Sequence, residues 1–231
     1  SDEFVKKMAR IPLIHQPGAV FEYGQSTDVL ARVIEIVSGE SLDIFLEENI
    51  FLPLGMKNTG YFVEEQFIDR VAEQKPDGNG NLRPLHRVDR LPTWIPGGHG
   101  LISTAGDYWK FAQMLLGGGK FKGVRVLGST TVSYMTSDHL GKSIDKKSLN
   151  RYSKGHGFGL GVAVRTENGV APWSGSIGDY YWLGIAGTNF LVSPQHDLVM
   201  VFMAQEWLTA LPNRDLMFNL IFQTIEGLKT N

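Results

Sequence analysis

The segment YYWLGIAGTNFLVSPQHDLVMVFMA, residues 180–204, is the most strand-like part of the chain and decides its fold class. Aromatic and β-branched residues fill both of its halves, and Ser-Pro-Gln-His-Asp at 193–197 is typical of a turn. The pattern predicts strands at Tyr181–Val192 and Leu198–Ala204, joined by that turn. The second strand is apolar throughout, which predicts a central strand covered on both faces.

Before this segment, the chain has mainly the periodicity of helices. Spacing and end signals predict helices at residues 27–37, 41–53, 103–116 and 129–135, and a last helix at about 212–228. The first helix carries one apolar stripe, formed by Val29, Leu30, Val33, Ile34 and Val37. Ser103-Thr104, with Asp107 placed for a capping box, opens the third helix. A further strand is expected at Phe158–Arg165.

These elements group into three regions. Residues 1–137 are expected to form a mostly helical subdomain with a long surface loop at 74–96. Residues 138–154 are polar and are expected to form a mobile loop, and residues 155–231 an antiparallel sheet with a C-terminal helix. Helices followed by an antiparallel sheet predict an α+β architecture.

Composition excludes several classes of function. The 231 residues carry a net charge of −2 with scattered Lys and Arg, so we expect no nucleic-acid partner. No apolar run is long enough to span a bilayer, so no membrane partner is expected. The six histidines are far apart and lack ligand spacing, which predicts no metal site and no cofactor. The absence of cysteine suits the cytoplasm, which is the compartment we expect.

Short motifs with a chemical meaning occur in unsuitable contexts. Residues Ser143 to Lys146 formally match S-x-x-K, the nucleophile motif of penicillin-binding enzymes. That chemistry needs the serine at the start of a buried helix, whereas the neighbourhood here is polar and loop-like, so coincidence is the favoured interpretation. The glycine runs at 96–100 and 117–119 lack phosphate-loop spacing and are better explained as turns and a helix end.

Two features leave a structural and a functional interpretation open. Tyr23, taken alone, is a packing residue whose hydroxyl reaches solvent. Gly184 and Gly187 lie inside the most strand-like segment, beside Trp182. A glycine in a strand marks either a bulge with aromatic packing or a place where a ligand approaches the backbone. The residues by themselves do not favour one interpretation over the other.

Three stretches together resemble a known family. These are PGAVFEYGQSTDVLARVIEIVSGESLDIFLEENIFLPLGMKNTGY, GGHGLISTAGDYWKFAQMLLGGG and WLGIAGTNFLVSPQHDLVMVFMAQ. In the same order, over almost the whole chain, they are similar to the class C β-lactamase-like serine hydrolases, and most of all to the branch called family VIII carboxylesterases. The resemblance implies a β-lactamase and penicillin-binding-protein-like fold, in which an antiparallel sheet is flanked by helices and joined to a helical subdomain.

The resemblance also implies catalytic roles. In that family a Ser of S-x-x-K is acylated by an ester or amide, and a tyrosine moves the proton. Tyr23 matches that tyrosine and would act as general base and acid. In the same register the backbone N–H of Ile185 would be one oxyanion donor.

Four further residues are expected to bind the substrate. Trp182 and Gly184 match the Trp-x-Gly form of a family strand that lines the site, and Tyr181 lies beside them. Gln25 stands where the family usually has Asn, and Trp182 stands where the β-lactamases have Lys. Both departures favour small neutral esters as substrates over β-lactams.

In the family, the nucleophile segment and the N-terminal strands of the sheet precede the tyrosine motif by many residues, so the resemblance implies that they lie outside these 231 residues. We therefore expect an N-terminal companion chain or segment that carries S-x-x-K, while this chain supplies Tyr23 and the Trp-x-Gly strand. The expected function is ester hydrolysis through an acyl-enzyme. The alternative is a non-catalytic relative that serves in binding or assembly.

Overall fold

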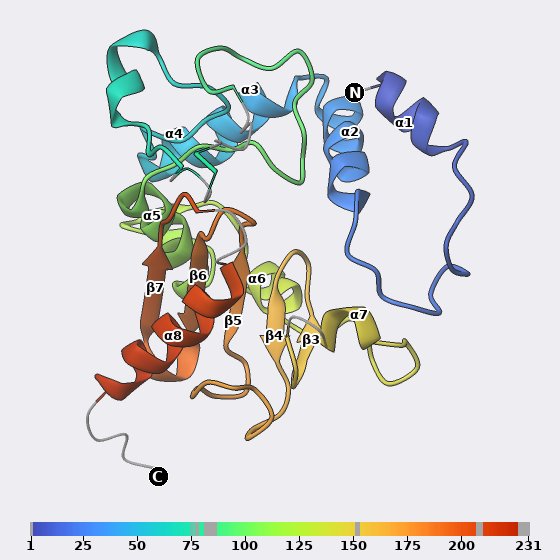
Figure 1. The fold of residues 1–231 in the computed structure, drawn as a ribbon, viewed down its shortest axis with the longest axis vertical. Helices are drawn as coiled ribbons and strands as arrows, with labels where there is room; N and C mark the ends of the chain where they lie inside the picture. Colours follow the sequence, from blue (N-terminus) through green and yellow to red (C-terminus); the bar gives the residue numbers. More distant parts are fainter. Residues whose placement is uncertain are drawn as a thin grey trace.

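A five-stranded antiparallel sheet forms the centre of the protein, with its strands in sequence order from β3 to β7 (Figure 1). The computed structural model describes residues 2–74, 76, 79–80, 87–150, 153–206 and 210–225. The strands are β3 His156–Phe158, β4 Ala163–Arg165, β5 Tyr180–Leu183, β6 Asn189–Ser193 and β7 Leu198–Phe202. A separate two-stranded hairpin pairs β1 Lys120–Phe121 with β2 Val124–Arg125. The α+β architecture expected from the sequence is confirmed.

Helices cover both faces of this sheet (Figure 1). Tyr180, Phe190 and Val192 point to the face covered by α5 Ala105–Leu116 and α6 Ser129–Met135. Tyr181 and Leu191 point to the opposite face, which is covered by α8 Ala210–Gln223. This alternation is the period of two that a strand imposes on its side chains. Each face therefore has its own layer of apolar side chains.

The remaining helices lie beyond one end of the sheet or at its edge (Figure 1). They are α1 Asp2–Met8, α2 Ser26–Ser38, α3 Leu42–Leu46, α4 Leu52–Leu54 and α7 Lys147–Asn150, with 3-10 turns at Glu65–Arg70 and Pro194–His196. Phe51, Leu54 and Met56 share one buried cluster with α5, α6 and the sheet. The boundary expected at residue 137 thus marks a change from helices to strands. Residues from both sides of it belong to one hydrophobic core.

Each of two segments that were predicted as a single strand is a hairpin of two strands. Residues 181–192 divide into β5 and β6, because the Gly184 N–H donates to the Thr188 carbonyl at 2.8 Å and Gly187 takes a φ of 99°, which closes a turn. Residues 158–165 likewise divide between β3 and β4, with a bond of 2.8 Å from the Gly159 N–H to the Val162 carbonyl. The apolar sequence on either side of each turn concealed the turn.

The strand expected at the centre, Leu198–Ala204, is β7 at one edge of the sheet that the described residues form, and four of its five residues are half-buried. The helix expected to stop at Pro53 continues to Leu54 and ends at Gly55, whose φ is 66°. Proline is tolerated there because it falls in the first turn after a π-helical turn, Glu47–Phe51.

Parts of three expected segments lie outside the described residues. They are residues 75, 77–78 and 81–86 of the loop at 74–96, residues 151–152 of the segment at 138–154, and the end of the last helix at Leu228. The described part of 138–154 contains α7, and Asp145 forms a parallel β-bridge with Val20.

Most of the apolar stripe of α2 faces away from the protein, and only Ile34 of the predicted stripe packs against a buried cluster. Leu30, Ile36 and Val37 are 54, 65 and 81% exposed, whereas the buried residues of this helix are Asp28 and Ala31. An amphipathic helix of a globular protein normally turns its apolar stripe inward. In this helix Ala31 and Ile34 pack inward, whereas most of the large apolar side chains are exposed.

Candidate active site

Tyr23 and Trp182 are in contact, although 159 residues separate them in the chain. The indole Nε1 of Trp182 donates a hydrogen bond of 3.3 Å to the hydroxyl oxygen of Tyr23. The two ring centroids lie 5.1 Å apart. Tyr23 is 52% exposed, so its hydroxyl is accessible from outside the protein. The two residues that the sequence placed in one site are therefore brought together.

A series of aromatic rings holds this pair in place. Phe21 lies 4.8 Å from Phe158, and Phe158 lies 5.0 Å from Trp182, measured between ring centroids. The Phe21 N–H donates to the Asp145 carbonyl at 2.9 Å, next to the bridge of Val20. The segment that precedes α2 is thereby attached to the β3 edge of the sheet. Sequence reasoning missed Phe158, because the strand pattern does not reveal which rings meet across strands.

The turn after Trp182 requires glycine at its first position. A Cβ atom at Gly184 would lie 2.2 Å from Thr188 Oγ1, far inside contact distance. Ile185 follows on the turn and is 57% exposed. None of the described residues accepts a hydrogen bond from the Ile185 N–H. Within the part of the chain that the structure describes, this N–H group is therefore a donor without an acceptor on the exposed turn after Trp182.

Gln25 lies two residues after Tyr23 and is the N-cap residue of α2. Its carbonyl accepts from the N–H groups of Asp28 and Val29, at 3.1 and 3.2 Å. Its side chain makes no capping bond and is exposed. The amide of Gln25 is therefore free to meet a ligand beside Tyr23.

Tyr181 does not line this surface, which corrects its assignment as a substrate-binding residue. The side chain is fully buried on the α8 face of the sheet, and its hydroxyl accepts a bond of 3.1 Å from Arg214 Nη1. The hydroxyl also bonds to Ser153. Burial raises the pKa of Tyr181 above its ordinary value. The alternation along β5 places Tyr181 opposite to its neighbour Trp182, so its role is structural.

The formal S-x-x-K match also has a structural role. Ser143 lies in an exposed turn and does not open a helix. The ammonium of Lys146 lies 3.0 Å from Asp138 Oδ2 in an ion pair. Its charge is thus balanced by a carboxylate, which supports coincidence as the origin of the motif.

The glycine run at 96–100 packs against α2. The buried carboxylate of Asp28 accepts bonds from the N–H groups of Gly97 and Gly98, at 2.9 and 3.0 Å. A Cβ at Gly97 would lie 2.3 Å from the Thr27 carbonyl oxygen. The glycines therefore allow close approach of two backbones, as the interpretation as turns implied.

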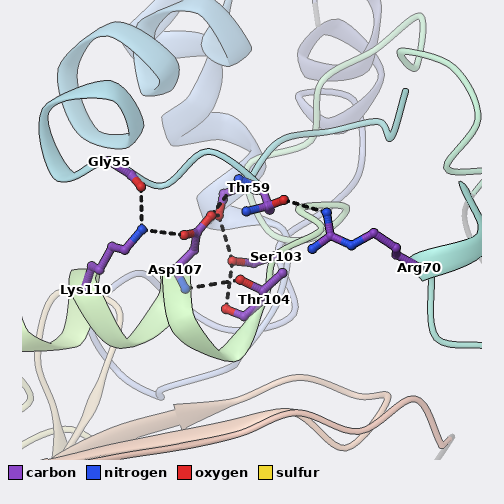
Figure 2. Close-up of polar contacts among 8 residues, drawn as sticks. Gly55, Thr59, Arg70, Ser103, Thr104, Asp107 and Lys110 are labelled. Carbon is purple, nitrogen blue, oxygen red and sulfur yellow. Dashed lines mark hydrogen bonds and ion pairs between the residues drawn. The ribbon is translucent and has the colours of Figure 1, made fainter. Parts of the chain in front are cut away.

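A buried carboxylate explains another distinctive stretch, PLGMKNTG together with LISTAGD (Figure 2). Thr104 caps α5 by accepting from the Asp107 N–H at 3.2 Å. The Asp107 carboxylate does not complete the expected capping box. It accepts from the Asn58 N–H at 2.6 Å and pairs with Lys110 Nζ at 2.8 Å. Asp107 therefore clamps the segment after α4 onto α5 and takes no part in the candidate site.

The described residues contain no group of three potential metal ligands among His, Cys, Asp and Glu. Within the same residues, no helix combines the length and the apolarity that crossing a membrane requires.

Comparison with known proteins identifies the family. Protein Rv1367c of Mycobacterium tuberculosis is 32% identical over 88% of this chain and 53% of its own length. Lovastatin esterase of Penicillium rubens is 30% identical over 59% of this chain and 35% of its own length. The structure of EstCE1, described as a hydrolase with promiscuous acyltransferase activity, has 22% identity and a TM-score of 0.78 over 98% of this chain and 61% of that one.

The chain thus spans about half the length of its mycobacterial relative. The likeness to EstCE1 shows a β-lactamase and penicillin-binding-protein-like fold, as the resemblance of the sequence implied. The β-lactamase family profile matches residues 1–220. On that match, the chain belongs to the β-lactamase family, a family of hydrolases with esterases among its members.

Proposed function

We propose that this chain supplies one half of the active site of a serine hydrolase, which cleaves small esters or amides through an acyl-enzyme. The observation that carries the proposal is the hydrogen bond of 3.3 Å from Trp182 Nε1 to the Tyr23 hydroxyl. A phenol held by a donor, half exposed, can take a proton from a nucleophilic serine and return it to the leaving alcohol. Tyr23 is therefore assigned the proton shuttle.

The exposed turn of β5 and β6 supplies the remaining groups of this half-site. The free N–H of Ile185 is assigned as one oxyanion donor, a kind of group whose removal costs about 3 kcal/mol of transition-state stabilisation. Trp182 forms one wall, and Gly184 lets the backbone approach the substrate. Gln25, exposed beside Tyr23, offers its amide to the carbonyl or acyl group of the ester.

The nucleophile pair, a Ser and a Lys spaced as S-x-x-K, is proposed to come from an N-terminal companion chain or segment. The open apolar face of α2 supports this partner, because Leu30, Val33, Ile36 and Val37 form one exposed stripe on the helix that begins just after Tyr23. A helix docked on that stripe would bury the apolar surface and could present a serine at Tyr23. The relatives are long enough to contain such a segment, since this chain spans about half of Rv1367c.

The rival proposal is a non-catalytic module that uses the same fold for binding or assembly. The same stripe on α2 favours it, since an exposed apolar face is typical of a surface that meets another protein. The two proposals differ in what they require of Tyr23, because only the enzyme needs its hydroxyl.

A chimera separates the two proposals. The part of Rv1367c that this chain does not match would be joined to residues 1–231, and hydrolysis of p-nitrophenyl butyrate would be measured. We expect turnover that falls by about 10² to 10⁴-fold in Tyr23→Phe, the range typical of a lost general base. The matched control is Tyr134→Phe, at a tyrosine 63% exposed on α6, which should leave turnover unchanged. A folded chimera that is inactive, or equally active as Tyr23→Phe, would favour the non-catalytic module.

The docking face has a separate test. Val33→Asp and Val37→Asp in the same chimera should expose surface that normally lies in the contact, and should lower its melting temperature. Leu216→Asp, at a leucine 58% exposed on α8, changes an equally exposed apolar residue away from that face and should have a much smaller effect. Equal effects at all three positions would remove the α2 stripe as the docking face.

A further inference from the structure

A second pair of reactive side chains lies at the opposite end of the sheet from Trp182 and the Gly184 turn. Ser176 is in the loop that leads from β4 into β5, and His196 ends the 3-10 turn between β6 and β7. Because β5 and β6 are antiparallel, these two connections meet at the same end of the sheet. The Ser176 hydroxyl oxygen lies 2.9 Å from His196 Nε2, within hydrogen-bond distance.

A buried carboxylate fixes the serine. Asp179, 3% exposed, accepts a bond of 2.7 Å from the Ser176 N–H through Oδ2. Its other oxygen, Oδ1, accepts from the Ser193 hydroxyl at 2.6 Å, on the last residue of β6. Gly175 precedes the serine with a φ of 145°, a conformation that favours glycine. Through Asp179 the backbone of Ser176 is thus connected to the start of β5 and to the end of β6.

The histidine has one nitrogen without a partner. The Nδ1 atom of His196 is buried and makes no hydrogen bond to any of the described residues. The imidazole also contacts the ring of Phe222 on α8, at 5.5 Å between centroids. Buried polar atoms are almost always satisfied, so an exception calls for an explanation. In the tautomer that carries its proton on Nδ1, Nε2 accepts the hydrogen bond of the Ser176 hydroxyl and can take its proton.

A positive charge lies beside the same serine. Arg165 is 3% exposed and donates through Nη1 to the Trp173 carbonyl at 3.2 Å. A Cβ on Gly175 would lie 2.7 Å from that Nη1, which places the guanidinium next to the residue before Ser176. Burial lowers the pKa of Arg165 and the charge of Asp179 opposes that change, so this carboxylate attracts the guanidinium, although the described residues form no ion pair with it. An anion that forms at the serine would lie close to the same guanidinium.

Ser176 and Arg165 help to line a depression of about 830 Å³, together with Gln195 and Asn219. His196 and Asp179 are not part of this lining and meet it through their bonds to Ser176. The depression lies on a part of the molecule that the half-site at Tyr23 does not use. It is wide open and its lining is mostly polar, which suits a small, polar and partly hydrated ligand.

We infer that Ser176 and His196 form a second nucleophilic pair, which small activated esters such as aryl acetates acylate. The Ser176 hydroxyl attacks the ester carbonyl while its proton passes to His196 Nε2. The new bond joins Oγ to the carbonyl carbon, and the resulting oxyanion lies in the field of Arg165. When the bond from carbon to the aryl oxygen breaks, Nε2 returns the proton and a neutral phenol leaves. The products are acyl-Ser176 and the phenol.

The carboxylate of Asp179 contributes through charge. During the step the imidazole becomes a cation, and Asp179 is the acidic group fixed on the same serine. Burial raises the pKa of Asp179, while the hydrogen bonds from Ser193 and Ser176, and to a lesser extent nearby positive charge, oppose that change. The pair needs no companion segment, so its activity is independent of the function proposed for Tyr23.

The test uses the 231-residue chain alone. The chain would be treated with a fluorescent fluorophosphonate, digested, and the labelled peptide identified by mass spectrometry. The expected label is on Ser176, and Ser176→Ala should abolish it. His196→Gln should slow labelling by about 10²-fold, as expected for loss of a general base. Ser174→Ala and Ser143→Ala, which change exposed serines outside the pair, should label at the unchanged rate.

A second measurement follows the ester chemistry directly. After incubation with p-nitrophenyl acetate, the mass of the intact chain should show a single acetyl group, and that group should be absent in Ser176→Ala. Thermal melting of each variant shows whether the fold is retained. An unlabelled wild-type chain, a label on any other serine, or an unchanged rate in folded His196→Gln would each overturn the inference.

Discussion

The indole of Trp182 donates a hydrogen bond to the hydroxyl of Tyr23 across 3.3 Å, so the end of β5 and the segment before α2 form one polar contact. The phenol thereby has a fixed orientation although its segment is exposed. A proton shuttle needs such an orientation, because proton transfer depends on hydrogen-bond reach to the reacting group.

Replacing Trp182 by Phe tests that contact. The ring contact with Phe158 is kept, while the Nε1 donor is lost, and such a bond is worth about 1 kcal/mol. In the chimera with the Rv1367c segment, we expect turnover of p-nitrophenyl butyrate to fall by about 5-fold or more, which that energy corresponds to. Trp109→Phe, at a tryptophan 41% exposed on α5, is the control and should leave turnover unchanged. Equal turnover in both variants would show that Trp182 does not orient Tyr23.

The turn beside Trp182 makes a prediction about stability. Gly184→Ala should lower the free energy of unfolding by about 1 to 2 kcal/mol, because the new methyl group meets Thr188 Oγ1. Without that oxygen, the nearest atom is Thr188 Cβ at 3.6 Å, an ordinary contact. Urea unfolding of Gly184→Ala in a Thr188→Ala background should therefore show little further loss. If the two losses simply add, the clash with Thr188 is not their cause.

Gly97 should tolerate substitution less well than Gly184. Its Cβ would meet the Thr27 carbonyl oxygen at 2.3 Å, a backbone atom that cannot rotate away. We expect Gly97→Ala to cost about 2 to 4 kcal/mol of unfolding free energy, and to weaken the bonds to Asp28. Gly106→Ala is the control, since nothing lies within 4 Å of its Cβ position on α5, and it should stabilise by about 0.5 to 1 kcal/mol. Comparable losses at both positions would contradict the close approach.

A buried histidine predicts how stability depends on pH. Burial lowers the pKa of His156 to about 4, helped by the charges of Arg165 and Arg214. In the unfolded chain His156 has its ordinary pKa of about 6.5, so it binds a proton at a higher pH than in the folded protein. The stabilisation is therefore fully present above that value and is lost as the pH falls toward 4. The loss is about 3 kcal/mol, from 1.4 kcal/mol for each pH unit.

The measurement is urea unfolding at intervals between pH 7 and pH 4. His156→Gln retains a donor for the Lys154 carbonyl, which His156 Nδ1 contacts at 2.8 Å, but it cannot titrate. This variant should show a flatter pH dependence than the wild type across that window. An identical slope would assign the acid sensitivity to other groups.

The fold was largely predictable from the sequence, and each error of that prediction has a physical reason. Strands, helices and their order follow from periodicity. The hairpin turns at Gly184 and Gly159 were missed because apolar residues flank both and keep the strand pattern continuous. The stripe on α2 was identified in part, since Ile34 packs inward and Ile36 lies on the exposed face, and periodicity says only that one face is apolar. Whether that face meets this chain's core or another surface is a property of tertiary packing.

The site was predictable to a lesser degree. Tyr23 and Trp182 were placed together by family resemblance, and no pattern in the residues alone connects positions 159 apart. Tyr181 was misassigned because adjacency in a strand was taken for adjacency in space, whereas neighbours in a strand face opposite sides. Ser176 and His196 carry no motif, since their 20-residue separation spans two hairpin connections. Only the register of β5 and β6 brings them together.

The attachment of the Tyr23 segment to the far end of the sequence has a consequence for the synthesis of the protein. Phe21 and Tyr23 leave the ribosome before their partners Phe158 and Trp182, which follow much later. At about 5 to 20 residues per second, the 159 residues between Tyr23 and Trp182 take about 8 to 30 s to translate. During this interval the segment that carries Phe21 and Tyr23 is without its ring contacts to the sheet. This protein is therefore at its most exposed to chaperones and proteases before its last third has been made.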